Sequence, residues 1–175
     1  AAGILGVRRL LWLDYPDAGD YPEHRVRLDV IRAIRELEPE LVVTVDPWSP
    51  YESHPDHRLC GLAVAGAALL YALPTIRTDP EVDRRFRPYP LAGVAFYHTA
   101  HPNQYVAVDE EDWRRRWEAI ACHRSQLDDA TLEAYRLYFE ARARQHGEAV
   151  GAPRAEAFKV LPASLLHCVP EAAEL

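Results

Sequence analysis

The chain has 175 residues, 49% of them hydrophobic, which is enough to bury one sizeable core. A formal net charge of −7 is a poor match for a surface that neutralises phosphates, so we expect no nucleic-acid partner. No apolar run reaches the roughly 20 residues of a membrane span. The three cysteines form no CxxC pair, which is typical of a reducing compartment, and we therefore expect a cytoplasmic protein.

The first part of the chain predicts a strand, a helix and a second strand. Leu10–Leu13 is a short apolar run that ends at the turn-rich Asp14–Asp20. Pro22–Glu38 carries apolar residues at a helical period, and Leu41–Val45 is continuously apolar, as in a strand buried on both faces. We therefore predict a βαβ unit in which the two strands are parallel neighbours.

The rest of the chain continues the alternation of helices and strands. We predict an Ala/Leu/Gly-rich helix ending near Leu73, an irregular stretch, two strands and two helices, the last four being Gly93–Tyr97, Tyr105–Val108, Asp109–Leu127 and Asp129–His146. The sequence holds no repeat and no obvious linker. We expect one α/β domain over residues 1–175.

The loop His54-Pro55-Asp56-His57 is the first candidate site, because it follows a buried strand and begins a helix. Open α/β sheets place ligand sites at this position. Two imidazoles and a carboxylate can supply a metal ligand and a second titratable group. The alternative is a plain helix N-terminus that Asp56 caps, with solvated histidines.

Asp46 stands at the end of the same strand, with Trp48 and Tyr51 in the loop that follows. These side chains suit the wall of a sugar-sized pocket, or else an Asp-Pro turn with two aromatic rings covering the sheet edge. In the earlier loop, Asp17 is the one residue for which we favour a functional role over an ordinary turn. His123 lies on the flank of the predicted tryptophan-bearing helix Asp109–Leu127, where a surface or interface position explains it equally well.

Several enzyme classes lack their usual parts in this sequence. There is no GxSxG elbow, no GxGxxG fingerprint and no GxxxxGK[ST] loop. The chain therefore offers no sign of a serine hydrolase, a dinucleotide oxidoreductase or a P-loop NTPase.

Five segments, in the correct order, resemble the PIG-L/LmbE-type zinc-dependent N-deacetylases, a family that includes N-acetylglucosaminyl-phosphatidylinositol de-N-acetylases and the deacetylases of mycothiol and bacillithiol synthesis. The segments are AAGILGV at Ala1–Val7, LDYPDAGD at Leu13–Asp20, the valine-rich strand and His-Pro-Asp-His over Pro39–His57, AIACHRSQ at Ala119–Gln126 and RAEAFKVLP at Arg154–Pro162. The resemblance covers nearly the whole chain and implies a Rossmann-like, mostly parallel sheet flanked by helices.

The resemblance also implies an activity and roles for the signature residues. It implies hydrolysis of the acetamide of an N-acetylglucosamine-type sugar or glycoconjugate, with zinc as the cofactor and a small amino-sugar as the partner. His57 matches a zinc ligand, and His54 matches the histidine whose imidazolium stabilises the oxyanion. Asp56 is expected to orient an imidazole. We assign substrate-binding roles to a further set of residues: Asp17, Asp46, Tyr51 and His123.

The family's first signature, Ala-His-Pro-Asp-Asp, is not in this chain. In the family it supplies two zinc ligands and the general base, so we expect that an N-terminal βα part is missing and that this chain alone is inactive. We also expect a homo-oligomer or a bound N-terminal fragment, because a missing strand would expose a sheet edge. The alternative is a non-enzymatic module of the same fold that binds a sugar or a protein.

Overall fold

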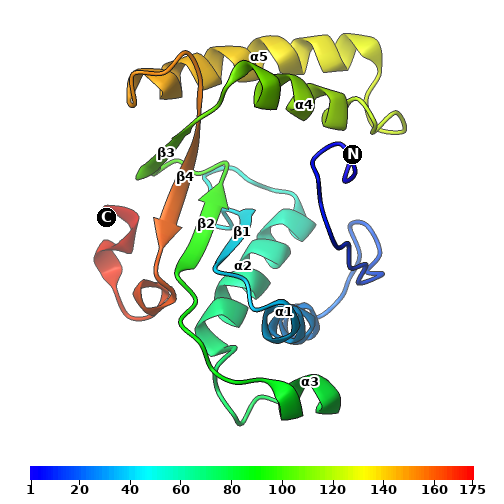
Figure 1. Cartoon of the computed structure of the whole chain (residues 1–175), viewed down its shortest axis with the longest axis vertical. Coiled ribbons are helices and arrows are strands. Elements are labelled where there is room, and N and C mark those ends of the chain that lie inside the picture. Colours follow the sequence, from blue (N-terminus) through cyan, green and yellow to red (C-terminus); the bar gives the residue numbers. More distant parts are fainter. The chain divides into compact units, whose positions relative to one another are not determined.

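The computed structural model describes residues 1–175 and contains a four-stranded sheet with the order β1-β2-β4-β3 (Figure 1). The strands are β1 (Leu41–Val45), β2 (Gly93–Tyr97), β3 (Gln104–Ala107) and β4 (Ala155–Leu161). β1 pairs with β2 in parallel, and β2 pairs with β4 in antiparallel register. The sheet is therefore mixed, and with its flanking helices it confirms the α/β class.

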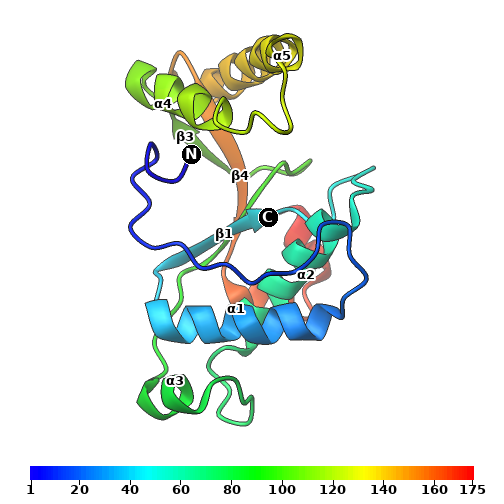
Figure 2. The same cartoon turned by 90° about the vertical axis from the view of Figure 1, so that its right-hand side faces the viewer.

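Figure 2 shows the helices in a view turned by 90° from Figure 1. They are α1 (Glu23–Leu37), α2 (Pro55–Leu70), α3 (Pro80–Arg85), α4 (Glu110–Ile120) and α5 (Asp129–Glu148), followed by the 3-10 turns η1 (Ala163–Leu166) and η2 (Pro170–Ala173). Two elements were not predicted. They are α3, inside the stretch expected to be irregular, and β4.

Leu10–Leu13 is not a strand, so its predicted pairing with β1 is wrong. Leu10 and Trp12 are 56% and 78% exposed, and β1 has β2 as its parallel partner instead. The crossover between these two strands runs through α2 and α3. The predicted burial of β1 on both faces is also wrong at its start, where Leu41 and Val43 are exposed. β1 is an edge strand, and the apolar run at residues 10–13 lacks the partner strand that would bury it.

The core fixes α2 between α1 and the sheet. On one side, Ile31 and Ile34 of α1 pack against Ala67 and Tyr71 of α2. On the other side, α2 packs against β2 through a second buried cluster: Val64, Ala65, Ala68, Val94 and Phe96. Alanines at these contacts allow close approach of the two helices and the sheet. The N-terminus of α2 is thereby held beside the end of β1.

The side chain of Arg35 in α1 is only 3% exposed, and it links this helix to α3 and to the segment that follows α2. Its guanidinium forms an ion pair with Asp83 of α3 at 2.7 Å and donates to the carbonyls of Tyr71, Leu73 and Ile76. A buried cation is tolerated only when its donors are satisfied in this way. This network is the reason that the stretch after α2 is ordered.

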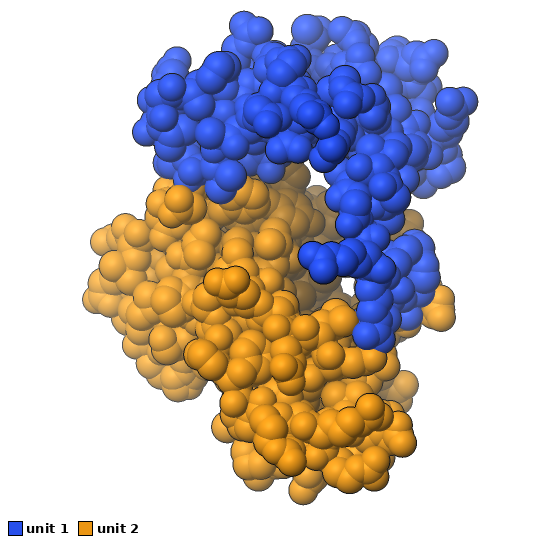
Figure 3. All heavy atoms as spheres, in the orientation of Figure 1, with its two compact units in different colours: residues 1–12, 105–157 blue, residues 13–104, 158–175 orange.

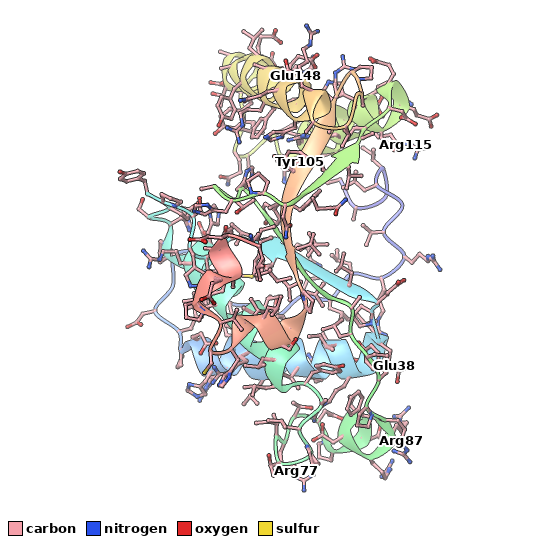
Figure 4. All side chains as sticks on the ribbon, turned by 90° about the vertical axis from the view of Figure 1, so that its left-hand side faces the viewer. Glu38, Arg77, Arg87, Tyr105, Arg115 and Glu148 are labelled. Carbon is pink, nitrogen blue, oxygen red and sulfur yellow. The ribbon has the colours of Figure 1, made fainter.

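The chain forms two compact units, one of residues 1–12 and 105–157, the other of residues 13–104 and 158–175 (Figure 3). In the first unit, Trp113 and Trp117 of α4 pack against Ala143 of α5. Arg115 and Glu148 lie on the exposed surfaces of those helices (Figure 4). The single domain stays a prediction. None of the helices is long and apolar enough to cross a membrane.

Candidate active site

Asp46 continues the pairing of β1 and then turns the chain away from the sheet. Its backbone N–H donates to the carbonyl of Tyr97 at 2.9 Å. Its carboxylate Oδ1 accepts from the backbone N–H of Trp48 at 2.9 Å, and the residue is 7% exposed. Asp46 is therefore a buried carboxylate at the carboxyl end of a parallel strand, the position predicted for it. Tyr51, further along the loop, is fully exposed.

His54 and His57 occupy the first turn of α2. His54 is the N-cap residue and Pro55 is the first helical residue, a position that suits proline. Because residues three apart lie on one helix face, the two imidazole rings stack with centroids 4.5 Å apart. His54 Nδ1 is buried and has no hydrogen-bond partner. A buried, unsatisfied ring nitrogen is a ready ligand atom for a metal ion.

Glu52 holds both histidines, a role that the sequence did not predict. Its Oε1 accepts from the backbone N–H of His54 at 2.8 Å, and its Oε2 lies 3.0 Å from His57 Nδ1. The hydrogen bond with His57, followed by that with His54, lowers the pKa of Glu52 below its ordinary value. An ionised carboxylate can only accept, so His57 Nδ1 carries a hydrogen, and in the neutral ring Nε2 keeps its lone pair.

Asp56 ties the Pro16–Gly19 loop to the start of α2. Its Oδ2 accepts from the backbone N–H of Ala18 at 2.7 Å, and its Oδ1 accepts from the hydroxyl of Tyr21 at 2.9 Å. The bond from Ala18 is the largest of the effects that lower the pKa of Asp56. Burial and the bond to Asp56 raise the pKa of Tyr21 to about 12. The hydrogen bonds to Asp56 thus come from Ala18 and Tyr21, whereas it is Glu52 that contacts the imidazole of His57.

The docked loop places a third ligand atom near the histidine. Ligand atoms of Asp17, His54 and Asp56 all lie within 4.8 Å of one another. One imidazole nitrogen and two carboxylate oxygens form a donor set that suits zinc and other borderline divalent cations. The orphaned Nδ1 of His54 fits such an ion or, when it carries a proton, a substrate oxygen, but not both at once. His57 is not in this group, but its lone pair at Nε2 makes it a second histidine ligand candidate on the same helix face.

The structure does not bring all the predicted site residues together. Asp46 lines a cavity of about 340 Å³, whose lining does not include His54, Asp56 or His57. His123 is exposed and lies after α4, in the other compact unit.

Comparison with known proteins gives one family and several relatives. A profile of the PIG-L family, described as GlcNAc-PI de-N-acetylase, matches residues 1–68. The diacetylchitobiose deacetylase of Thermococcus kodakarensis is 31% identical over 170 residues, which cover 97% of this chain and 63% of the relative. The chain thus spans less than two thirds of that protein's length.

Two solved structures share the fold. The N,N'-diacetylchitobiose deacetylase from Pyrococcus horikoshii, determined with its inhibitor MPG, has a TM-score of 0.87 and 32% identity, over 99% of this chain and 65% of that one. The conserved protein TT1542 from Thermus thermophilus has a TM-score of 0.72 and 26% identity, over 92% of this chain and 69% of that one.

Proposed function

Because the chain belongs to the PIG-L family of N-deacetylases, we propose that it takes part in removing the acetyl group from an N-acetylglucosamine-type sugar or glycoconjugate. The observation that carries the proposal is the pair of oriented imidazoles at the end of β1. Glu52 fixes His57 through Nδ1, and His54 keeps an unsatisfied buried nitrogen beside two carboxylates. This is the arrangement that amide hydrolysis at a metal centre needs.

The proposed metal is zinc, held by His57 through Nε2. The contact with Glu52 supports this assignment, since histidine ligands of metals commonly donate their other N–H to a carboxylate. Asp17 and Asp56 lie with His54, not with His57, and are the carboxylates of this chain nearest to the two histidines that could complete a metal site. When bound, the ion supplies Lewis-acid polarisation of the acetamide carbonyl and lowers the pKa of a nearby water molecule.

The other residues act on the substrate. His54, as an imidazolium, donates a hydrogen bond to the carbonyl oxygen while negative charge develops there. Asp56 keeps the Pro16–Gly19 loop against the helix, which brings Asp17 within reach of a sugar hydroxyl. Our remaining proposed sugar contacts are Asp46, Tyr51 and His123.

The test measures acetate released from N,N'-diacetylchitobiose with zinc added, for two proteins. One is the chain alone, and the other is a chimera in which an added amino-terminal segment with the family's Ala-His-Pro-Asp-Asp signature precedes Ala1. We expect hydrolysis by the chimera and none by the chain alone. His57→Ala is expected to abolish zinc binding and hydrolysis in the chimera.

A matched control separates the site from the fold. His24 is an exposed histidine of α1, so His24→Ala removes an imidazole that is not part of the proposed site and should leave acetate release unchanged. If the folded chimera binds the sugar but releases no acetate, the proposed hydrolysis is refuted. The non-enzymatic binding module then becomes the better account.

A further inference from the structure

A cavity of about 340 Å³ lies between the sheet and the C-terminal turns η1 and η2, which run beside β4 (Figure 1). The volume is in the range of small-molecule sites. Its walls come from the loop after β1, from β2 and β4, and from the C-terminal segment. They include Asp46, Trp48, Phe96, Lys159, Leu161 and Leu166. Most of the wall is apolar; His101 and Cys168 also line it and are exposed, and two buried ionisable groups, Asp46 and Lys159, interrupt it.

These two groups are buried charges of opposite sign. Asp46 is 7% exposed and Lys159 is 6% exposed. Lys159 pairs with Phe96 across β4 and β2, so both side chains point to the face of the sheet that α2 covers. Asp46 and Lys159 form no ion pair with each other. The ammonium group of Lys159 donates to the carbonyl of Ala173 at 3.0 Å, and the carboxylate of Asp46 accepts from the N–H of Trp48.

Burying an ammonium and a carboxylate with so few partners costs free energy. A ligand that accepts from Lys159 and donates to Asp46 offsets that cost for both groups. A simple anion satisfies the lysine but is repelled by the aspartate, and a simple cation has the reverse problem. The wall therefore favours a neutral group that carries a donor and an acceptor side by side.

The apolar walls and Trp48 narrow the class of ligand. Trp48 packs edge-on against Phe96 with ring centroids 5.6 Å apart, which holds its indole at the cavity. A fixed indole face offers contact to the C–H surface of a sugar, and leucine side chains suit a methyl group. An acetamido group has an N–H donor, a carbonyl acceptor and a methyl group. We propose that this cavity binds the acetamido group of an N-acetylated sugar.

The loop that begins with Asp46 and Trp48 ends at His54, so one segment lines the cavity and carries the histidines. This sugar is then the neighbour of the unit that is hydrolysed, a step that rests on the proposed function. The proposed substrate therefore contains at least two linked N-acetylated sugars.

Lys159 is the only lysine of the chain, so protein labelled with ¹³C-lysine gives NMR signals from this cavity alone. Titration of the chain with N,N'-diacetylchitobiose is expected to shift the Lys159 side-chain signals saturably. The fully deacetylated disaccharide, which has no acetamido group, should not shift them. The proposal is overturned if the acetylated disaccharide gives no shift. It is also overturned if free leucine, a zwitterionic probe used instead of the disaccharide, shifts the Lys159 signals.

Variants test the two sides of the recognition. Asp46→Asn keeps an oxygen for the Trp48 N–H but removes the charge, and it should weaken disaccharide binding, measured by calorimetry, about tenfold or more. Ala172→Trp fills the cavity and should abolish the Lys159 shift, whereas the exposed Ala149→Trp should not. If both cavity variants bind the disaccharide as the wild type does, the proposal fails.

Activity separates this proposal from the function it rests on. If the chimera releases acetate and Asp46→Asn leaves the KM for the disaccharide unchanged, the cavity proposal is overturned while the deacetylase function stands. If the disaccharide shifts Lys159 but no acetate is released, the cavity proposal is supported and the deacetylase function fails.

Discussion

Glu52→Gln is the sharpest test of the proposed site because one carboxylate contacts both histidines. It accepts from His57 Nδ1 at 3.0 Å and from the His54 backbone N–H at 2.8 Å. Glutamine keeps the shape but has one oxygen, so it can accept from only one of these donors. If that oxygen stays with the His54 N–H, the amide NH2 faces His57 and can donate to Nδ1 of the Nε2–H tautomer, so the substitution removes the preference for the Nδ1–H form.

The magnitude follows from exposure. The side chains of His57 and Glu52 are 54% and 26% exposed, so the contact has only the strength of a surface pair. A contact of that strength changes the ratio of Nδ1–H to Nε2–H tautomers by about 1.4-fold to 5-fold. Loss of such a contact typically lowers metal affinity about 10-fold to 100-fold, and the exposure places this pair near the lower limit.

The tautomer ratio is measured on the chain itself, from ¹H–¹⁵N correlation spectra of the His57 ring. We expect the Nδ1–H form to dominate in the wild type and to decline in Glu52→Gln. Zinc affinity of the chimera is measured by equilibrium dialysis. Glu81→Gln, which alters an exposed carboxylate of α3, is the control. Unchanged tautomers together with unchanged zinc affinity in Glu52→Gln would refute the role given to this carboxylate.

Three further predictions concern stability and titration. Arg35→Met leaves Asp83 unpaired in a buried site and should cost about 3–5 kcal/mol in urea unfolding, against about 0.5 kcal/mol or less for the exposed Arg32→Met; equal losses would contradict the buried network. Burial raises the pKa of Asp83, but hydrogen bonds outweigh it, so the pKa lies below 3.8. The stabilisation that ionised Asp83 gives to the fold is present above pH 3.8 and is lost as the pH falls through the lower pKa of the folded state. Asp83→Asn should therefore flatten the acid dependence of the unfolding free energy. Tyr21 has a pKa of about 12, so the stabilisation that its hydrogen bond gives to the fold is present below pH 10.0 and declines as the pH rises through 12. Tyr21→Phe should remove one late phase from the ultraviolet titration of the tyrosines. An unchanged titration would contradict the bond to Asp56.

Periodicity predicted the elements whose burial follows from their own sequence. The helices α1 and α5 begin and end within two residues of the predicted limits, and β2 has the predicted limits. In α4 the observed helix stops at Ile120, where the stripe formed with Trp113 and Trp117 ends, and turns follow. Of these elements, α1 and α4 have a clear apolar face, which is what sequence periodicity reports, and β2 was found from its continuous apolarity.

The errors lie where structure depends on a partner elsewhere in the chain. Leu10–Leu13 has a strand-like composition, but a strand forms only where another strand pairs with it. β4 was missed because Glu156 and Lys159 interrupt its apolar residues. Lys159 is buried at the cavity wall, and no local pattern identifies a lysine that faces inward.

The same limit explains which site residues the sequence could indicate. The sequence could indicate His54 and His57 as site residues because a signature places them on one helix face. Their different roles depend on Glu52, whose carboxylate reaches the ring of His57 but only the backbone of His54. That difference leaves one imidazole with a fixed tautomer and the other with a buried free nitrogen. A fixed tautomer suits a permanent ligand, and a free nitrogen suits a group that must gain and lose a proton. In the proposed function, the division of labour between the two histidines therefore comes from Glu52, a residue outside the signature.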